Sequence, residues 1–121
     1  MPKPSFWSNR MKGVWYAFKG LFLLLRTEPS IQIQFVLAII MTVAGCYFEI
    51  SATEWALQCL AIGMVMGIEG LNTAIEKVAD YIQPEFDTKI GFIKDIAAGA
   101  VMLVSIIAVI VGLLIYVPKI W

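Results

Sequence analysis

Long stretches without a charged residue constrain this chain more than any other feature. Residues 29–48 carry no charge over twenty positions, and residues 96–117 carry none over twenty-two. A helix needs about 20 apolar residues to cross the roughly 30 Å hydrocarbon core of a bilayer. In a chain of 121 residues that is 60% hydrophobic and 15% charged, a soluble core would not bury such segments. The sequence therefore predicts an all-α membrane protein, with residues 1–121 as one domain.

The composition excludes several classes of site and partner. Nine basic and nine acidic residues give a net charge of zero, so no nucleic-acid partner is expected. The sequence has no histidine, which excludes histidine metal ligands and a histidine proton shuttle. It contains no Walker loop, GxGxxG or kinase catalytic-loop motif, so a nucleotide site of those types is not expected.

Residues 6–26 form a different kind of segment. Their apolar residues recur at helical spacing. Three cations lie seven residues apart on one stripe: Lys12, Lys19 and Arg26. This pattern is typical of an amphipathic helix that lies in the membrane interface with its cations facing water. Pro29 disfavours helical backbone at Glu28 and suits the first turn of a new helix, so the chain is expected to turn there into its first spanning helix.

The second spanning helix needs polar residues to complete it. Its uncharged part, residues 55–68, covers only about 21 Å as a helix, against a hydrocarbon core of roughly 30 Å. The helix must therefore continue, which places Glu69 inside the membrane. The predicted spanning helices are 29–48, 55–82 and 92–117.

The continuation of this second helix carries a polar stripe. Five polar residues fall at i, i+3, i+4, i+7 and i+11, on one helix face: Glu69, Asn72, Thr73, Glu76 and Asp80. A charge at the bilayer centre costs about 2.5–3.5 kcal/mol on insertion scales, so this face is not expected to point at lipid. It must face protein, water or a ligand.

Basic residues are distributed unevenly between the two ends of the spanning helices. Eight of them lie before the first span or between the second and third: Lys3, Arg10, Lys12, Lys19, Arg26, Lys77, Lys89 and Lys94. The loop between the first two spans holds Glu49 and Glu54 and no basic residue. By the positive-inside rule the N-terminus is cytoplasmic, and the C-terminus, with Lys119, is outside. Lys77 and Lys89 are interpreted as solvated interfacial charges rather than ligands.

This topology brings distant polar residues to the cytoplasmic side. Glu28 begins the first span there, the stripe ends the second, and Lys94 and Asp95 open the third. Carboxylates from two helices suit a hard divalent cation. Lys94 beside a helix N-terminus suits a phosphate, because free backbone N–H groups and the helix dipole add to its charge. Gly91 would let the backbone approach such a phosphate closely.

Two runs of the sequence resemble a known family. Residues 69–80 read EGLNTAIEKVAD, and residues 94–101 read KDIAAGAV. This pair is similar to the bacterial integral-membrane diacylglycerol kinases and the closely related undecaprenol kinases, and the similarity extends over nearly the whole chain. The resemblance implies a homotrimer in the bacterial inner membrane, each subunit having a surface helix and three spans. It implies transfer of the γ-phosphate of MgATP to the hydroxyl of diacylglycerol or undecaprenol.

The resemblance also implies roles for individual residues. Glu69 resembles the family's general base, and Asn72 matches a polar catalytic-site position. Glu28 and Glu76 resemble its metal ligands, with Mg²⁺ as the metal. The nucleotide-binding positions are matched by Tyr16, Lys19, Asp80, Gly91, Lys94 and Asp95. One subunit is not expected to cover the whole stripe, so the resemblance and the topology both predict active sites shared between subunits.

Some positions depart from the family pattern. Asn9 aligns with an arginine of the family, with Arg10 one step away. Gln34 stands where diacylglycerol-type members have an acid and undecaprenol-type members often have histidine. Thr73 and the Ala98-Gly99 pair match the undecaprenol-type branch better. The sequence leaves the identity of the lipid acceptor open.

Two other classes of membrane protein are alternatives to an enzyme. A small proton-coupled transporter also uses membrane carboxylates in a short chain, but it would place them near the midplane, accessible from both sides. A non-catalytic helical membrane subunit would leave the polar stripe without an explanation. The clustering of carboxylates toward one side of the membrane favours the enzyme.

Overall fold

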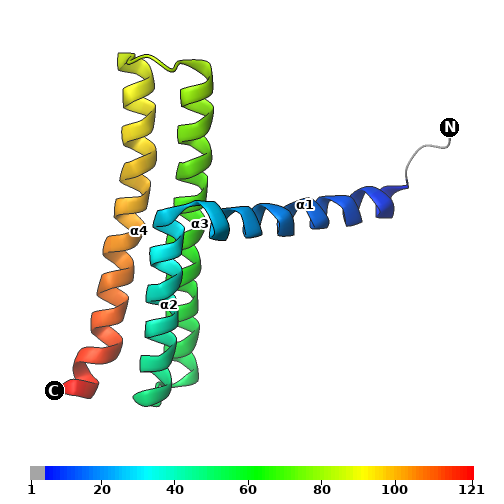
Figure 1. The fold of residues 1–121 in the computed structure, drawn as a ribbon. Coiled ribbons are helices and arrows are strands. Elements are labelled where there is room, and N and C mark those ends of the chain that lie inside the picture. The colour runs from blue at the N-terminus through cyan, green and yellow to red at the C-terminus, as the bar shows by residue number, and fades with distance from the viewer. Residues whose placement is uncertain (1–4) are drawn as a thin grey trace.

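The computed structural model describes residues 5–121, which form four helices joined by short connections (Figure 1). In chain order these are α1 (Phe6–Thr27), α2 (Pro29–Tyr47), α3 (Ala52–Ile82) and α4 (Thr88–Ile120). Helices α2, α3 and α4 lie side by side, and each is long and apolar enough to cross a membrane. Figure 1 shows α1 projecting sideways from this bundle. The predicted all-helical architecture is confirmed, while Lys3 lies outside the described residues.

The corner between α1 and α2 lies at Glu28, as the following proline predicted. Glu28 has extended backbone (φ −103°, ψ 111°), and Pro29 begins α2. The side chain of Gln32 braces this corner, because its Nε2 donates to the carbonyls of Leu25 and Arg26 at 3.2 and 2.9 Å. These carbonyls belong to the last turn of α1, where backbone acceptors have no helical partner. The corner is therefore fixed by a side chain as well as by the backbone.

Helices α3 and α4 form a long antiparallel hairpin, and they share the most extensive helix–helix contact of the chain. A capping box begins α3: Ser51 Oγ accepts from the N–H of Glu54 at 3.2 Å, and Glu54 Oε1 accepts from the N–H of Ser51 at 2.9 Å. At the start of α4, Asp87 Oδ1 accepts from two N–H groups of the first turn. These caps start α3 at Ala52 and α4 at Thr88, earlier than the expected residues 55 and 92.

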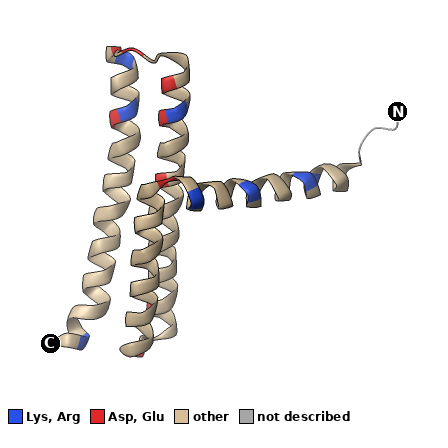
Figure 2. Cartoon of the chain, in the orientation of Figure 1, with Lys and Arg blue, Asp and Glu red and all other residues tan. Residues whose placement is uncertain are grey.

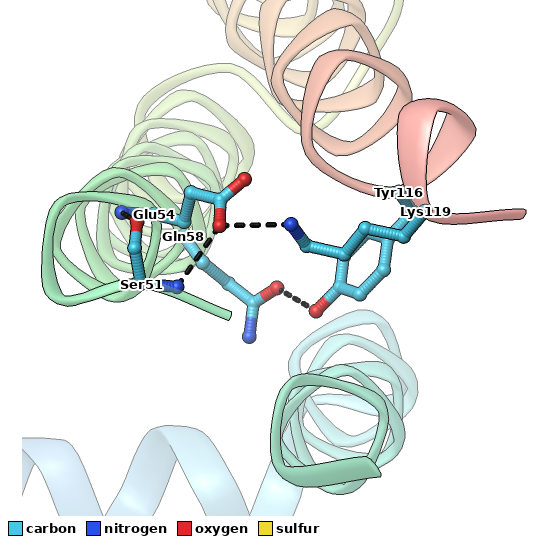
Figure 3. Close-up of polar contacts among 5 residues, drawn as sticks. All are labelled: Ser51, Glu54, Gln58, Tyr116 and Lys119. Atoms are coloured by element: carbon cyan, nitrogen blue, oxygen red, sulfur yellow. Dashed lines mark hydrogen bonds and ion pairs between the residues drawn. The ribbon is translucent and has the colours of Figure 1, made fainter. Parts of the chain in front are cut away.

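Polar contacts join the three spanning helices at the end away from the α3–α4 loop, and Figure 3 draws those between α3 and α4. Lys119 Nζ lies 3.0 Å from Glu54 Oε1, so the cation near the C-terminus pairs with the start of α3. The hydroxyl of Tyr116 donates to Gln58 Oε1 at 2.6 Å. Gln58 Nε2 in turn donates to the carbonyl of Met41 in α2 at 3.0 Å. One amide side chain thus connects α3 to both of its neighbours.

Charged residues occupy the two ends of the bundle and the surface of α1 (Figure 2). Most of the charges on α3 and α4 lie on the part of the hairpin that extends past the α1–α2 corner. The lower part of the three-helix bundle is almost free of them until its far end. This distribution is typical of a membrane-spanning bundle with α1 at one interface.

Candidate active site

The polar stripe of α3 lies on a continuous helix, so its five members share one face as predicted. Asn72 is only 8% exposed, and Glu69 and Thr73 are partly buried. Glu76 and Asp80, which lie nearer the α3–α4 loop, are exposed. The stripe therefore runs from the packed part of the bundle to the open end of the hairpin.

The α1–α2 corner packs against one side of this stripe. Lys77 Nζ lies 3.3 Å from Glu28 Oε1. Seven residues earlier, Gly70 lies against the end of α1: a Cβ there would be 3.1 Å from Leu24 Cδ1. Because residues seven apart lie on one helix face, these two contacts fix the corner along α3. They place the Glu28 carboxylate within reach of the Lys77 ammonium, on the residue that follows Glu76.

Helix α4 lines the other side of the stripe. Lys94 Nζ forms an ion pair with Asp80 Oδ1. Ala79 and Ala97 are 5% and 8% exposed, so small side chains let the two helices pack closely at this level. The structure thus brings together Asp80 and Lys94, two of the predicted nucleotide-binding residues, whereas Asp95 is exposed on α4.

The phosphate site expected at the start of α4 is not formed as predicted. Because α4 begins at Thr88, Lys94 lies inside the helix rather than beside its N-terminus. Free backbone N–H groups occur only in the first turn of a helix, and Asp87 already accepts from two of them. The N–H of Gly91 donates to the Asp87 carbonyl at 2.8 Å, so it is not available to a phosphate. The prediction of a helix N-terminus beside Lys94 is wrong, and Lys94 contributes only its side-chain charge.

Two further predicted nucleotide-binding residues lie far from the stripe in a single chain. Tyr16 and Lys19 are on the part of α1 that projects from the bundle (Figure 1), and both are exposed. Among residues 5–121, neither side chain forms a hydrogen bond or an ion pair. One chain therefore does not assemble all of the predicted site residues.

Two buried amide oxygens have no hydrogen-bond partner in the described part of the chain: Asn72 Oδ1 and Gln34 Oε1. Gln34 lines an apolar cavity of about 290 Å³ between α2, α3 and α4. The same cavity is lined by Val65 and Met66, about one turn before Glu69. A buried acceptor without a donor is costly, so both oxygens are suited to a donor from a ligand or a partner chain. The sequence identified Asn72 as a site residue but Gln34 only as a departure from a pattern.

The carboxylates near the α1–α2 corner fit a magnesium ion in their donor chemistry. Glu28 at the α1–α2 corner and Glu76 on α3 both offer hard oxygen ligands, and the Glu28 carboxylate contacts Lys77, the residue after Glu76. In residues 5–121, no group of three or more Asp, Glu, Cys or His side chains lies close enough to hold a metal alone. Mg²⁺ is commonly bound by one or two carboxylates together with substrate phosphates and water. Two carboxylates with water therefore suffice for weak binding, and a nucleotide would complete the coordination.

The chain is similar to known proteins over most of its length. The family model for prokaryotic diacylglycerol kinase matches residues 15–116, a range that contains every predicted site residue. The undecaprenol kinase of Bacillus subtilis is 38% identical over 104 residues, covering 86% of this chain and 85% of that protein. The diacylglycerol kinase of Escherichia coli K12 is 32% identical over 100 residues, covering 83% and 82%. A diacylglycerol kinase of Synechocystis is 34% identical over 98 residues, covering 80% and 56%.

Proposed function

Because the chain belongs to the prokaryotic diacylglycerol kinase family, we propose that the stripe of α3, with Glu28 and Lys94, is its active site. Membership of this family makes the protein a multi-pass membrane lipid kinase that uses ATP. The transporter considered from the sequence has no support in the relatives, which are named as kinases. One observation carries the site proposal: Glu28 and Lys94 approach opposite sides of a single carboxylate stripe.

The reaction transfers a phosphoryl group, which needs positioning and charge neutralisation more than covalent chemistry by the protein. We assign Glu69 as the general base. Its carboxylate accepts the hydroxyl proton of the lipid as the lipid oxygen bonds to the γ-phosphorus of ATP. The bond from that phosphorus to the β–γ bridging oxygen breaks, and ADP leaves with the electron pair. Asn72, one turn further along α3, offers a buried amide to hold the reacting groups.

The charges around the stripe are assigned to the nucleotide. Glu28 and Glu76 would hold Mg²⁺, which neutralises phosphate charge when bound. Lys94 supplies a second cation, and Asp80 holds that side chain in place before the nucleotide arrives. The remaining nucleotide contacts are assigned, on the family resemblance, to Tyr16, Lys19, Asp95 and Gly91. Gly91 would contribute through its lack of a side chain rather than through its N–H.

We infer that the active unit is a homotrimer with shared sites. Tyr16 and Lys19 lie on α1, which projects sideways from the bundle, while Glu76 and Asp95 are exposed near the open end of the hairpin. A neighbouring subunit that covers the stripe would bring the missing nucleotide contacts to it. Burying the polar face between subunits also removes it from lipid.

We also propose that the site faces the cytoplasm across the bacterial inner membrane. The basic residues of α1 and those on either side of the α3–α4 loop lie toward one end of the bundle, whereas Lys119 lies at the other (Figure 2). The positive-inside rule therefore supports a cytoplasmic N-terminus and an external C-terminus. This orientation also places the carboxylate stripe where ATP is available.

The acceptor that we propose is a lipid alcohol, either diacylglycerol or undecaprenol. Both present one hydroxyl on an apolar body. The apolar cavity beside Gln34 ends about one turn from Glu69, which suits an acceptor whose chain lies in the membrane and whose hydroxyl reaches the stripe.

ADP release tests this function directly. Purified protein in detergent micelles receives MgATP with diacylglycerol, with undecaprenol, or with no lipid, and ADP is measured by a coupled assay. We expect release that depends on one of the two lipids and is lost in Glu69→Gln. Equal release with and without lipid, or none with either lipid, would contradict the proposal. The two arms run side by side also identify the acceptor.

A further inference from the structure

Lys77 forms an ion pair with a proposed metal ligand, a contact that the sequence did not predict. The sequence indicated a solvated interfacial charge. In the structure, the Lys77 ammonium lies 3.3 Å from Glu28 Oε1. The Lys77 side chain is 69% exposed, whereas that of Glu28 is 21% exposed. The pair therefore joins an open, flexible cation to a more enclosed carboxylate.

The carboxylate is the fixed member of this pair. The N–H of Glu28 donates to the Leu24 carbonyl at 3.2 Å, and its carbonyl accepts from the N–H of Gln32 at 3.0 Å. The Gln32 side chain ties the same corner to the end of α1. Lys77 instead reaches Glu28 through a four-carbon stem that is open to water. If a competitor arrives at Glu28, Lys77 is the partner that moves.

We propose that Lys77 occupies the cation position of Glu28 when no metal is bound, and that a divalent metal must displace it. This inference rests on the proposed role of Glu28 as a metal ligand. Lys77 directly follows Glu76, the second proposed ligand, so the competing charge is anchored in the turn where the metal would bind. A divalent ion and an ammonium at one carboxylate repel each other. Lys77 is therefore a positioning residue that holds Glu28 against α3 and lowers its metal affinity.

The expected effect is small because the lysine is exposed. Ion pairs of this kind contribute little, so removing Lys77 should tighten metal binding by about two- to five-fold. The effect should be local to Glu28. Lys89 provides a matched comparison, because it is an exposed lysine at the same end of the hairpin and forms no ion pair within residues 5–121.

The test uses Mn²⁺ as the probe, without nucleotide, so that it reports binding rather than turnover. Free Mn²⁺ is measured by electron paramagnetic resonance while the full-length protein in lipid nanodiscs is titrated. Lys77→Met should lower the Mn²⁺ dissociation constant two- to five-fold, while Lys77→Arg, which keeps the charge, should bind as the unmodified protein does. Lys89→Met removes the same charge and should leave the constant unchanged.

Several outcomes would overturn the inference. Equal tightening in Lys77→Met and Lys89→Met would mean that net charge, not displacement, sets the affinity. Weaker binding in Lys77→Met would mean that Lys77 assists the metal rather than competing with it. Glu28→Gln tests separately whether Glu28 is a metal ligand, on which this inference rests. If Mn²⁺ binding survives that change, the metal assignment of Glu28 fails as well. Loss of binding in Glu28→Gln with no gain in Lys77→Met would refute only the displacement, and ADP release would still report the kinase.

Discussion

Replacing Tyr116 with phenylalanine removes one hydroxyl from the buried contact that joins α4 to α3 (Figure 3). That hydroxyl donates to Gln58 Oε1 at 2.6 Å, and Gln58 and Tyr116 are 5% and 8% exposed. Phenylalanine keeps the ring and its edge-to-face packing on Phe48, whose centroid lies 5.8 Å away. The change removes this hydrogen bond together with a longer contact of the same hydroxyl to the Met41 carbonyl at 3.3 Å. We expect it to lower the free energy of unfolding without altering the fold.

The size of the effect follows from where the contact lies. In water-soluble proteins, leaving a buried acceptor without its donor costs about 1–3 kcal/mol. Hydrogen bonds between membrane helices average about 0.6 and reach about 1.7 kcal/mol, because separated helices find other partners in the bilayer. Both residues lie in spanning helices, so the membrane range applies, and the burial of both partners favours its upper half. We expect a loss of about 1–1.7 kcal/mol, which is roughly a five- to eighteen-fold change in the unfolding equilibrium.

A double-mutant cycle measures this contact. Unfolding is followed by circular dichroism as the mole fraction of dodecyl sulfate rises in mixed micelles, for Tyr116→Phe, Gln58→Leu and the double variant. The double variant should lose less stability than the sum of the single losses, because each single change already breaks the bond. Tyr47→Phe is the matched control: Tyr47 is 79% exposed, and its side chain donates no hydrogen bond in the described part of the chain. It should change stability by less than about 0.5 kcal/mol.

Two results would refute this reasoning. Fully additive losses in the cycle would show that the two side chains do not stabilise each other. A loss in Tyr47→Phe as large as that in Tyr116→Phe would show that removing a tyrosine hydroxyl at this end of the bundle acts through the detergent rather than through Gln58.

Three further predictions concern the candidate site. Glu69→Gln should keep ATP affinity nearly intact while kcat falls by roughly 10²–10⁴-fold, and loss of ATP binding with kcat retained would reassign Glu69 to the nucleotide. Glu28→Gln and Glu76→Gln should each raise the Mg²⁺ concentration needed for half-maximal activity, whereas unchanged titrations would make both residues structural. Native mass spectrometry from detergent should release assemblies of three 13.5 kDa chains, and a monomer with full activity would contradict the shared site.

The sequence predicted the helices better than it predicted their ends. The uncharged stretches and the cations spaced by seven indicate which segments are helical, and Pro29 indicates where α1 gives way to α2. The start of α3 had a readable signal, because Ser51 and Glu54 have the spacing of a capping box. Asp87 is likewise a favoured N-cap residue before Thr88. Hydropathy alone missed both starts because caps lie in polar sequence outside the apolar stretch.

The candidate site was predictable where it depends on one helix and not where it depends on packing. Helical spacing along α3 is enough to place Glu69, Asn72 and Glu76 on one face. The contact of Lys77 with Glu28 depends on which side of α3 the α1–α2 corner meets, and no local pattern encodes that rotation. The same limit applies to the Tyr116–Gln58 hydrogen bond, whose partners are 58 residues apart.

The two ion pairs at the stripe share a physical origin that bears on how ligands bind. A charge near the hydrocarbon boundary is costly without a partner, and a chain that binds MgATP needs several such charges before the ligand arrives. Glu28 and Lys94, assigned to the metal and the phosphates, are each paired within the chain, with Lys77 and Asp80. Binding of MgATP would then replace ion pairs within the chain by contacts with the ligand, instead of providing partners for unpaired charges. Breaking those pairs offsets part of the electrostatic attraction of the ligand, so removing Lys77, which has no assigned ligand contact, should strengthen metal binding at Glu28.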